Sequence, residues 1–124
     1  MAFFGLFRRR AKPRPIDPHA AHEAVSAGAL ALIDVRQPEE WAEGRPAGAR
    51  GAPLRDADFL DRAARAVGGD ASRPLATSCI TGARAGEGAK RLIAAGFADI
   101  SFVVGGFRAW REAGLPVDEP PFDD

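Results

Sequence analysis

The stretch Leu30-Ala31-Leu32-Ile33-Asp34-Val35 decides the fold class of this chain. It is apolar without alternation over its first four residues, which is typical of a strand covered on both faces in a parallel sheet. A helix is predicted before it, with Asp17 as N-cap, Pro18 at the first helical position and Gly28 as the stop. A second helix is predicted to begin after it, at Pro38.

The alternation of strands and helices continues along the chain. Apolar spacing and glycine stops predict helices over 59–67, 85–93 and 107–110, strands over 75–78 and 100–104, and a weaker strand within 49–54. This order predicts an α/β fold with a central parallel β-sheet and helices on both faces. Because such sheets place their sites at the carboxyl ends of the strands, we expect Asp34, Arg36, Cys79 and Gly105 at one edge.

Length and composition restrict the function classes. A chain of 124 residues is one domain, and 46% hydrophobic with 27% charged residues is a globular composition. The 17 basic and 17 acidic residues balance, which argues against nucleic-acid binding through bulk electrostatics. The one cysteine cannot form an internal disulfide, so we expect a reducing, cytoplasmic location.

The charge distribution predicts three parts: a basic and apolar N-terminal segment over 1–15 that is flexible, a domain over 16–117, and an acidic, solvated C-terminal tail over 118–124. The apolar residues at the start are too few to span a bilayer. A membrane contact through residues 3–10 is an alternative for this segment, but the nearby prolines favour a frayed end.

The most informative motif is Cys79-Ile80-Thr81-Gly82-Ala83-Arg84, between a predicted strand and a predicted helix. Backbone amides and the start of the helix would form an anion-binding nest, which Gly82 allows to curl and to which Arg84 adds a cation. Such donors favour thiolate over thiol, so Cys79 is a candidate nucleophile. The alternative is a small buried apolar residue.

Five motifs then occur in order: Leu32-Ile33-Asp34-Val35-Arg36, Pro38-Glu39-Glu40-Trp41, Gly44 to Ala49, the cysteine loop, and Val104 to Trp110 followed by Gly114-Leu115-Pro116. In these motifs the chain resembles the single-domain rhodanese-like sulfurtransferases. The resemblance implies a rhodanese-like fold and a Cys79 persulfide stabilised by Arg84 and the loop amides. The implied reaction moves sulfane sulfur from a donor, thiosulfate or another persulfide, to a thiophilic acceptor.

The same resemblance implies the partners: a small sulfur donor and a thiol or cyanide acceptor, with a protein acceptor as a further candidate. No metal-ligand spacing or phosphate-loop motif is present in the sequence, so we expect no metal and no cofactor. In the family, the residues matching Asp34 and Arg36 help order the catalytic edge. A contact between these two residues that only fixes the loops is the interpretation we favour. Trp41 and Trp110 are expected in the core.

The chain departs from the family pattern at three positions. Arg45 stands where a histidine is usual, Ile80 where many members have a basic residue, and Ala85 where a serine is common. The loop is therefore less cationic, and a doubly charged donor should be attracted less, since each charge contributes about 1 kcal/mol or more in a partly desolvated site.

Two other functions remain open from the sequence. Cysteine-loop phosphatases and arsenate reductases place five residues between Cys and Arg, whereas Cys79 and Arg84 enclose four. A non-catalytic rhodanese-like binding module would have no need of Cys79, Gly82 and Arg84. Both alternatives therefore rank below sulfur transfer.

Overall fold

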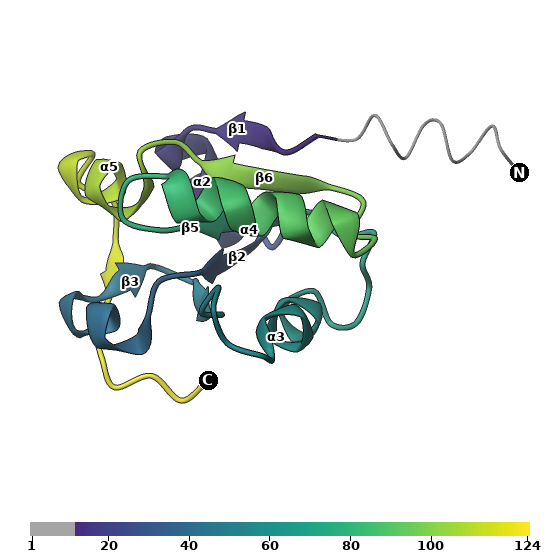
Figure 1. The fold of residues 1–124 in the computed structure, drawn as a ribbon. Coiled ribbons are helices and arrows are strands. Elements are labelled where there is room, and N and C mark those ends of the chain that lie inside the picture. The colour runs from purple at the N-terminus through teal and green to yellow at the C-terminus, as the bar shows by residue number, and fades with distance from the viewer. Residues whose placement is uncertain (1–11) are drawn as a thin grey trace, which may run out of the picture.

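The computed structural model describes residues 12–124, which form a parallel sheet between two layers of helices (Figure 1). The five strands are, in order across the sheet, β1 (Arg14–Ile16), β6 (Ile100–Val103), β5 (Leu75–Ser78), β2 (Ala31–Asp34) and β4 (Arg50–Gly51). All neighbouring strands run parallel. The predicted α/β fold is confirmed, and the unalternating β2 lies near the middle of the sheet.

The helices divide between the two faces of the sheet. α3 (Phe59–Ala66) and α4 (Ala83–Ala94) pack on one face, where Phe59 and Leu92 meet Ile33. α2 (Pro18–Ser26) and α5 (Gly106–Glu112) pack on the other, where Trp110 is fully buried. The segment predicted to begin a helix at Pro38 is a 3-10 helix, η1 (Pro38–Glu43), and buries Trp41. Both tryptophans are therefore in the core, as expected.

The register brings the carboxyl ends of the central strands together. Asp34 pairs with Ser78, and the Val35 N–H donates to the Ser78 carbonyl, so the residues after β2 and β5 leave the sheet side by side. The next strand, β6, is in register with β5 up to Phe102 opposite Thr77. Arg36, Cys79 and Gly105 consequently lie at the same edge of the sheet.

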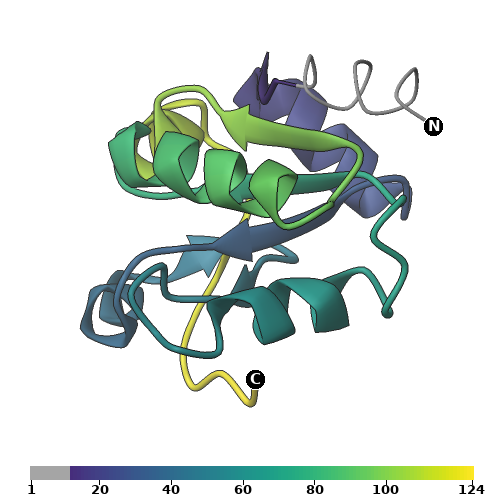
Figure 2. The ribbon, with the colours of Figure 1, turned by 45° about the vertical axis from the view of Figure 1, so that its right-hand side comes forward.

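A two-stranded antiparallel pair lies beside the main sheet. It joins β3 (Arg45–Pro46) to β7 (Val117–Asp118), and from there the yellow C-terminal tail passes β3 (Figure 2). The tail is less solvated at its end than expected: two hydrogen bonds, 3.0 and 3.1 Å long, join the Arg45 guanidinium to the Asp124 carboxylate. The division of the chain into three parts stays a prediction.

The N-terminal segment expected over 1–15 lies mostly outside the described residues, as does the membrane contact considered for residues 3–10. The described part of it includes the start of β1, whose Arg14 pairs with Ser101 of β6. Within residues 12–124, no helix has the length and apolar character that a bilayer crossing requires.

Candidate active site

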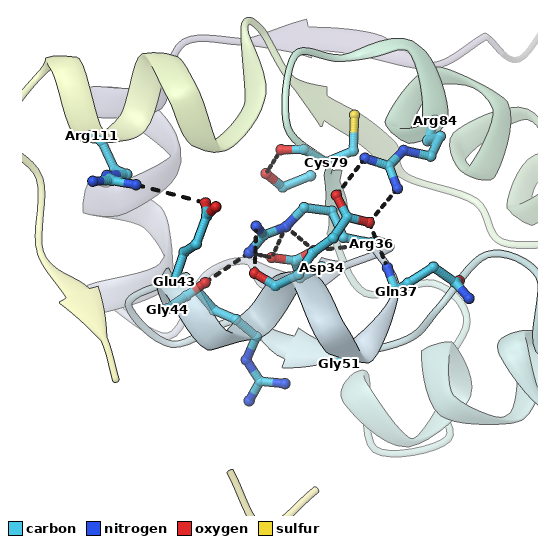
Figure 3. Close-up of polar contacts among 12 residues, drawn as sticks. Asp34, Arg36, Gln37, Glu43, Gly44, Gly51, Cys79, Arg84 and Arg111 are labelled. Carbon is cyan, nitrogen blue, oxygen red and sulfur yellow. Dashed lines mark hydrogen bonds and ion pairs between the residues drawn. The ribbon is translucent and has the colours of Figure 1, made fainter. Parts of the chain in front are cut away.

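Cys79 follows β5 directly and begins a tight loop that ends where α4 starts at Ala83 (Figure 3). Its Sγ accepts a hydrogen bond of 3.0 Å from the Gly82 N–H. Gly82 has φ of +125°, which L side chains rarely adopt, so a glycine is needed for this closure. The loop of Ile80, Thr81, Gly82 and Ala83 therefore turns back so that one backbone donor, the Gly82 N–H, points at the sulfur, and the role of the loop in substrate binding stays a prediction.

The start of α5 supports this loop from outside. The Phe107 N–H donates to the Cys79 carbonyl at 2.7 Å, and the Arg108 N–H donates to the Ile80 carbonyl at 3.0 Å. The backbones approach so closely that a Cβ on Gly106 would lie 2.5 Å from the Cys79 carbonyl oxygen. Because the N–H of a peptide group points opposite to its C=O, the N–H groups that follow these two carbonyls point away from α5.

Arg84 comes from the first turn of α4 and lies beside Cys79 (Figure 3). The two terminal nitrogens of its guanidinium, which form the fork of the side chain, donate to the carboxylate of Glu40 in η1 at 2.6 and 2.9 Å. Side-chain hydrogen bonding to Glu40 is the largest influence that raises the pKa of Arg84, with smaller Coulombic contributions from Glu40, Cys79 and Asp34. The loop cation is therefore already paired with a carboxylate.

Glu40 is the site residue that sequence reasoning missed. Its Oε1 also accepts the Gln37 N–H at 3.0 Å, in a capping box at the start of η1. Hydrogen bonds from Arg84 and Gln37 outweigh partial burial and lower the pKa of Glu40 from 4.5 to about 2. The local capping box could have been read from Gln37-Pro38-Glu39-Glu40, but the partner 44 residues further along could not.

Asp34 and Arg36 form a buried ion pair beneath the loop. The Arg36 guanidinium donates to both Asp34 carboxylate oxygens, to the Gly44 carbonyl at 2.7 Å and to the Glu40 carbonyl at 3.2 Å. It also lies over the Phe107 ring, 4.5 Å from the centroid. The expected contact between the two residues is present, and it ties β2, η1 and α5 together below Cys79.

The sulfur is shielded and two clefts open beside its loop. Cys79 is 1% exposed, so a substrate can reach the sulfur only with a terminal atom. One cleft, of about 430 Å³, includes Arg84 and Arg55 in its lining. The other, of about 610 Å³, includes Ile80 and Arg108. The two clefts therefore open onto residues that flank the sulfur, and Cys79 itself lines neither of them.

Two further side chains, His22 and Arg45, lie away from the sulfur. His22 packs edge-on against Trp110, on the α2 and α5 side of the sheet. Arg45, in place of the usual histidine, is buried between the Trp41 and Phe122 rings and bound to Asp124. This arginine serves to hold the C-terminal tail. Among residues 12–124, no cluster of three or more potential metal ligands is present.

Known proteins resemble the chain over most of its length. The model of the rhodanese-like domain family matches residues 17–113. The chain is 32% identical to thiosulfate sulfurtransferase 16, chloroplastic, of Arabidopsis thaliana, covering 84% of this chain and 92% of that protein. It is 33% identical to thiosulfate sulfurtransferase GlpE of Stutzerimonas stutzeri, covering 77% and 83%. The polysulfide-sulfur transferase homodimer of Wolinella succinogenes superposes with a TM-score of 0.71 at 30% identity, covering 96% and 89%.

Proposed function

The chain belongs to the family of rhodanese-like domains, and from this we propose that it is a rhodanese-type sulfurtransferase that carries sulfane sulfur on Cys79. The observation that carries the proposal is the hydrogen bond from the Gly82 N–H to the Cys79 Sγ, inside a loop with four residues between Cys79 and Arg84. In this loop one backbone donor, the Gly82 N–H, points at the sulfur. The curled amides of the loop would stabilise the terminal sulfur of a persulfide anion in the same way.

The reaction would proceed in two displacements at the same atom. The Cys79 thiolate attacks the terminal sulfur of thiosulfate, an S–S bond to the enzyme forms, and the donor's S–S bond breaks as sulfite leaves with the electron pair. An acceptor such as cyanide or a thiolate then attacks the outer sulfur, and the Cys79 thiolate leaves. The charge is the same on both sides of each step, so no oxidant or reductant is needed.

Three residues would assist these steps. Arg84 lies beside the sulfur and would bind the anionic group of the donor, within the limits set by its pairing with Glu40. Asp34 and Arg36 would act as positioning residues, because their buried pair lies below the loop and is tied to η1. The physiological acceptor would be a small thiol or a protein thiol. With one cysteine in the chain, we also propose a reducing, cytoplasmic setting.

Mass spectrometry tests the covalent intermediate. Incubation of the protein with thiosulfate alone should add the mass of one sulfur atom, and cyanide should return the original mass with release of thiocyanate. Cys79→Ser should abolish both the adduct and turnover while the circular dichroism spectrum stays that of the parent. Turnover near the parent level in this variant would refute the assignment of Cys79 as the carrier.

Steady-state kinetics test the order of events. No other thiol exists in the chain, so a Cys79 persulfide has no internal route to a disulfide and waits for an external acceptor. We expect parallel lines in double-reciprocal plots of rate against donor at several acceptor concentrations. Intersecting lines, together with failure to trap an adduct, would mean that donor and acceptor bind at the same time.

A further inference from the structure

We propose that Glu40 is a specificity-determining residue of the sulfur-transfer site: by holding the fork of Arg84, it disfavours doubly charged donors relative to singly charged ones. The inference rests on the proposed function, since it concerns the donor that Cys79 accepts. Both Glu40 carboxylate oxygens accept from the Arg84 guanidinium, at 2.6 and 2.9 Å, which is the planar bidentate geometry in which Arg and carboxylate bind most strongly.

The carboxylate is fixed independently of Arg84. The Gln37 N–H donates to its Oε1, and the backbone carbonyl of Glu40 accepts from the buried Arg36 guanidinium. About a third of each side chain in the Glu40 and Arg84 pair is exposed, so solvent and substrate can reach the pair. Glu40 is therefore an anchored anion at the rim of the loop. It remains charged at neutral pH, because its pKa is lowered to about 2.

The rest of the loop adds no charge. The residues between Cys79 and Arg84 are Ile80, Thr81, Gly82 and Ala83, so Arg84 is the one cation within the motif. With Glu40 bound to it, the net charge of the Glu40 and Arg84 pair is close to zero. A donor anion therefore meets a guanidinium whose attraction Glu40 has already neutralised, and this lost attraction is the penalty that the donor experiences. Because Coulomb energy is proportional to the charge of the donor, this penalty is about twice as large for a dianion as for a monoanion.

Two donors separate the effect of charge from the effect of chemistry. Thiosulfate is a dianion that releases sulfite, and methanethiosulfonate is a monoanion that releases methanesulfinate. In both, the Cys79 thiolate takes the terminal sulfur, and the leaving group departs with the electron pair. The ratio of the two kcat/KM values, thiosulfate over methanethiosulfonate, therefore reports on donor charge. This ratio also cancels the fraction of folded enzyme, so partial loss of structure in a variant cannot imitate the effect.

We expect Glu40→Gln to raise kcat/KM about thirtyfold for thiosulfate and about fivefold for methanethiosulfonate, which is a rise of about sixfold in the ratio. Glu39→Gln is the matched control: it removes the same charge from the adjacent residue, which is exposed and makes no side-chain hydrogen bond or ion pair among the described residues. Its ratio should stay within about twofold of the parent ratio. An unchanged ratio in Glu40→Gln, or equal changes for both donors, would overturn the proposal.

The Arg84→Ala background tests whether Glu40 acts through Arg84. Without the Arg84 guanidinium, Glu40 has no cation to neutralise. Adding Glu40→Gln should then change the ratio of the two kcat/KM values by less than about twofold. A sixfold rise there as well would show that Glu40 acts by its own charge, and would overturn the proposal that it acts through Arg84. The proposed function and the proposed role of Glu40 would be refuted by different results. No persulfide adduct on the parent with either donor would refute the proposed function, whereas an adduct with an unaltered ratio in Glu40→Gln would refute the role of Glu40 alone.

Discussion

Arg36 carries its positive charge into the interior, where 1% of its side chain is exposed, and within residues 12–124 Asp34 is its one carboxylate partner. Arg36→Met would leave the Asp34 charge buried without compensation. We expect the free energy of unfolding to fall by about 3–5 kcal/mol in urea denaturation. Replacing both charges, in Asp34→Leu with Arg36→Met, should recover a large part of this loss. A double variant no more stable than Arg36→Met would show that the carbonyl contacts of Arg36, and not its charge pairing, dominate.

The lowered pKa of Glu40 also affects the stability of the protein in acid. Its pKa is lowered from 4.5 to about 2 in the folded state, so the folded protein binds the proton less readily than the unfolded chain. The stabilisation is therefore complete above about pH 4.5 and is lost as the pH falls toward 2. Since the pair is one-third exposed, we expect about 1 kcal/mol after solvent screening.

Urea unfolding at pH 6 and at pH 2.5 measures this contribution. Between these pH values, Glu40→Gln should lose about 1 kcal/mol less stability than the parent, while Glu39→Gln should lose as much as the parent. Because the other carboxylates are common to the proteins compared, their contribution to the loss of stability cancels in the comparison. Equal losses in all three proteins would mean that the Glu40 and Arg84 pair adds nothing to folding.

At the scale of elements, the decisive contact is the one between the start of α5 and the cysteine loop. Gly106 has φ of +58°, and a Cβ there would lie 2.5 Å from the Cys79 carbonyl oxygen and 2.8 Å from the Ile80 carbonyl. Gly106→Ala must therefore move the loop as well as strain the backbone. We expect a loss of about 2–4 kcal/mol in stability and at least a tenfold loss of sulfurtransferase turnover.

Gly114→Ala is the control for backbone strain alone. Gly114 also has a positive φ, +72°, but nothing lies within 4 Å of the position that its Cβ would take. It should cost about 1 kcal/mol and leave turnover per folded molecule unchanged. If both variants lost the same stability and neither lost turnover, the close approach of α5 would be irrelevant to the geometry of the loop.

The elements that sequence patterns predicted are those with strong local signals. β2 is apolar up to Asp34, and β6 is apolar except for Ser101. α4 ends at Ala94, just before the glycine stop at Gly96, where the Gly96 and Phe97 N–H groups bond to the Ile93 and Leu92 carbonyls. β1 and β3 were not predicted, because each contains a proline and only two or three residues. Such short strands exist through pairing with residues far along the chain, which no local pattern encodes.

The candidate site divides in the same way. The cysteine loop was predictable because strand, glycine and helix are contiguous in sequence. The partner of Arg84 was not, because Glu40 lies on a separate element that only the fold brings near. Arg45 was noticed as a departure from the family pattern, but its partner Asp124 is 79 residues away. Pairings of this kind depend on tertiary structure, and a single sequence holds no signal for them.

At the scale of the whole molecule, the C-terminal tail is bound to the domain at Arg45. The guanidinium side chain is 5% exposed, lies 3.7 Å from the Phe122 ring centroid and pairs with Asp124, whose carboxylate also accepts the Gly51 N–H. Asp124→Ala would leave this buried cation without its carboxylate. We expect a loss of about 2–3 kcal/mol in urea denaturation.

Asp123→Ala is the matched control for this variant, since Asp123 is exposed and makes no hydrogen bond or ion pair among the described residues. Its stability should lie within about 0.5 kcal/mol of the parent. Turnover with small donors should be unchanged in both variants, because neither residue contacts the cysteine loop. Equal stability of Asp123→Ala and Asp124→Ala would show that the tail contact is not stabilising.

The strand order also determines when β1 can join the sheet during synthesis on the ribosome. β1 is the first strand of the described sheet to be synthesised. Its only partner in that sheet is β6, which is the last strand of the sheet to be synthesised. At about 5–20 residues per second, several seconds pass before that partner leaves the exit tunnel. During this interval β1 has no partner to pair with, so the five-stranded sheet can close only after β6 has been synthesised.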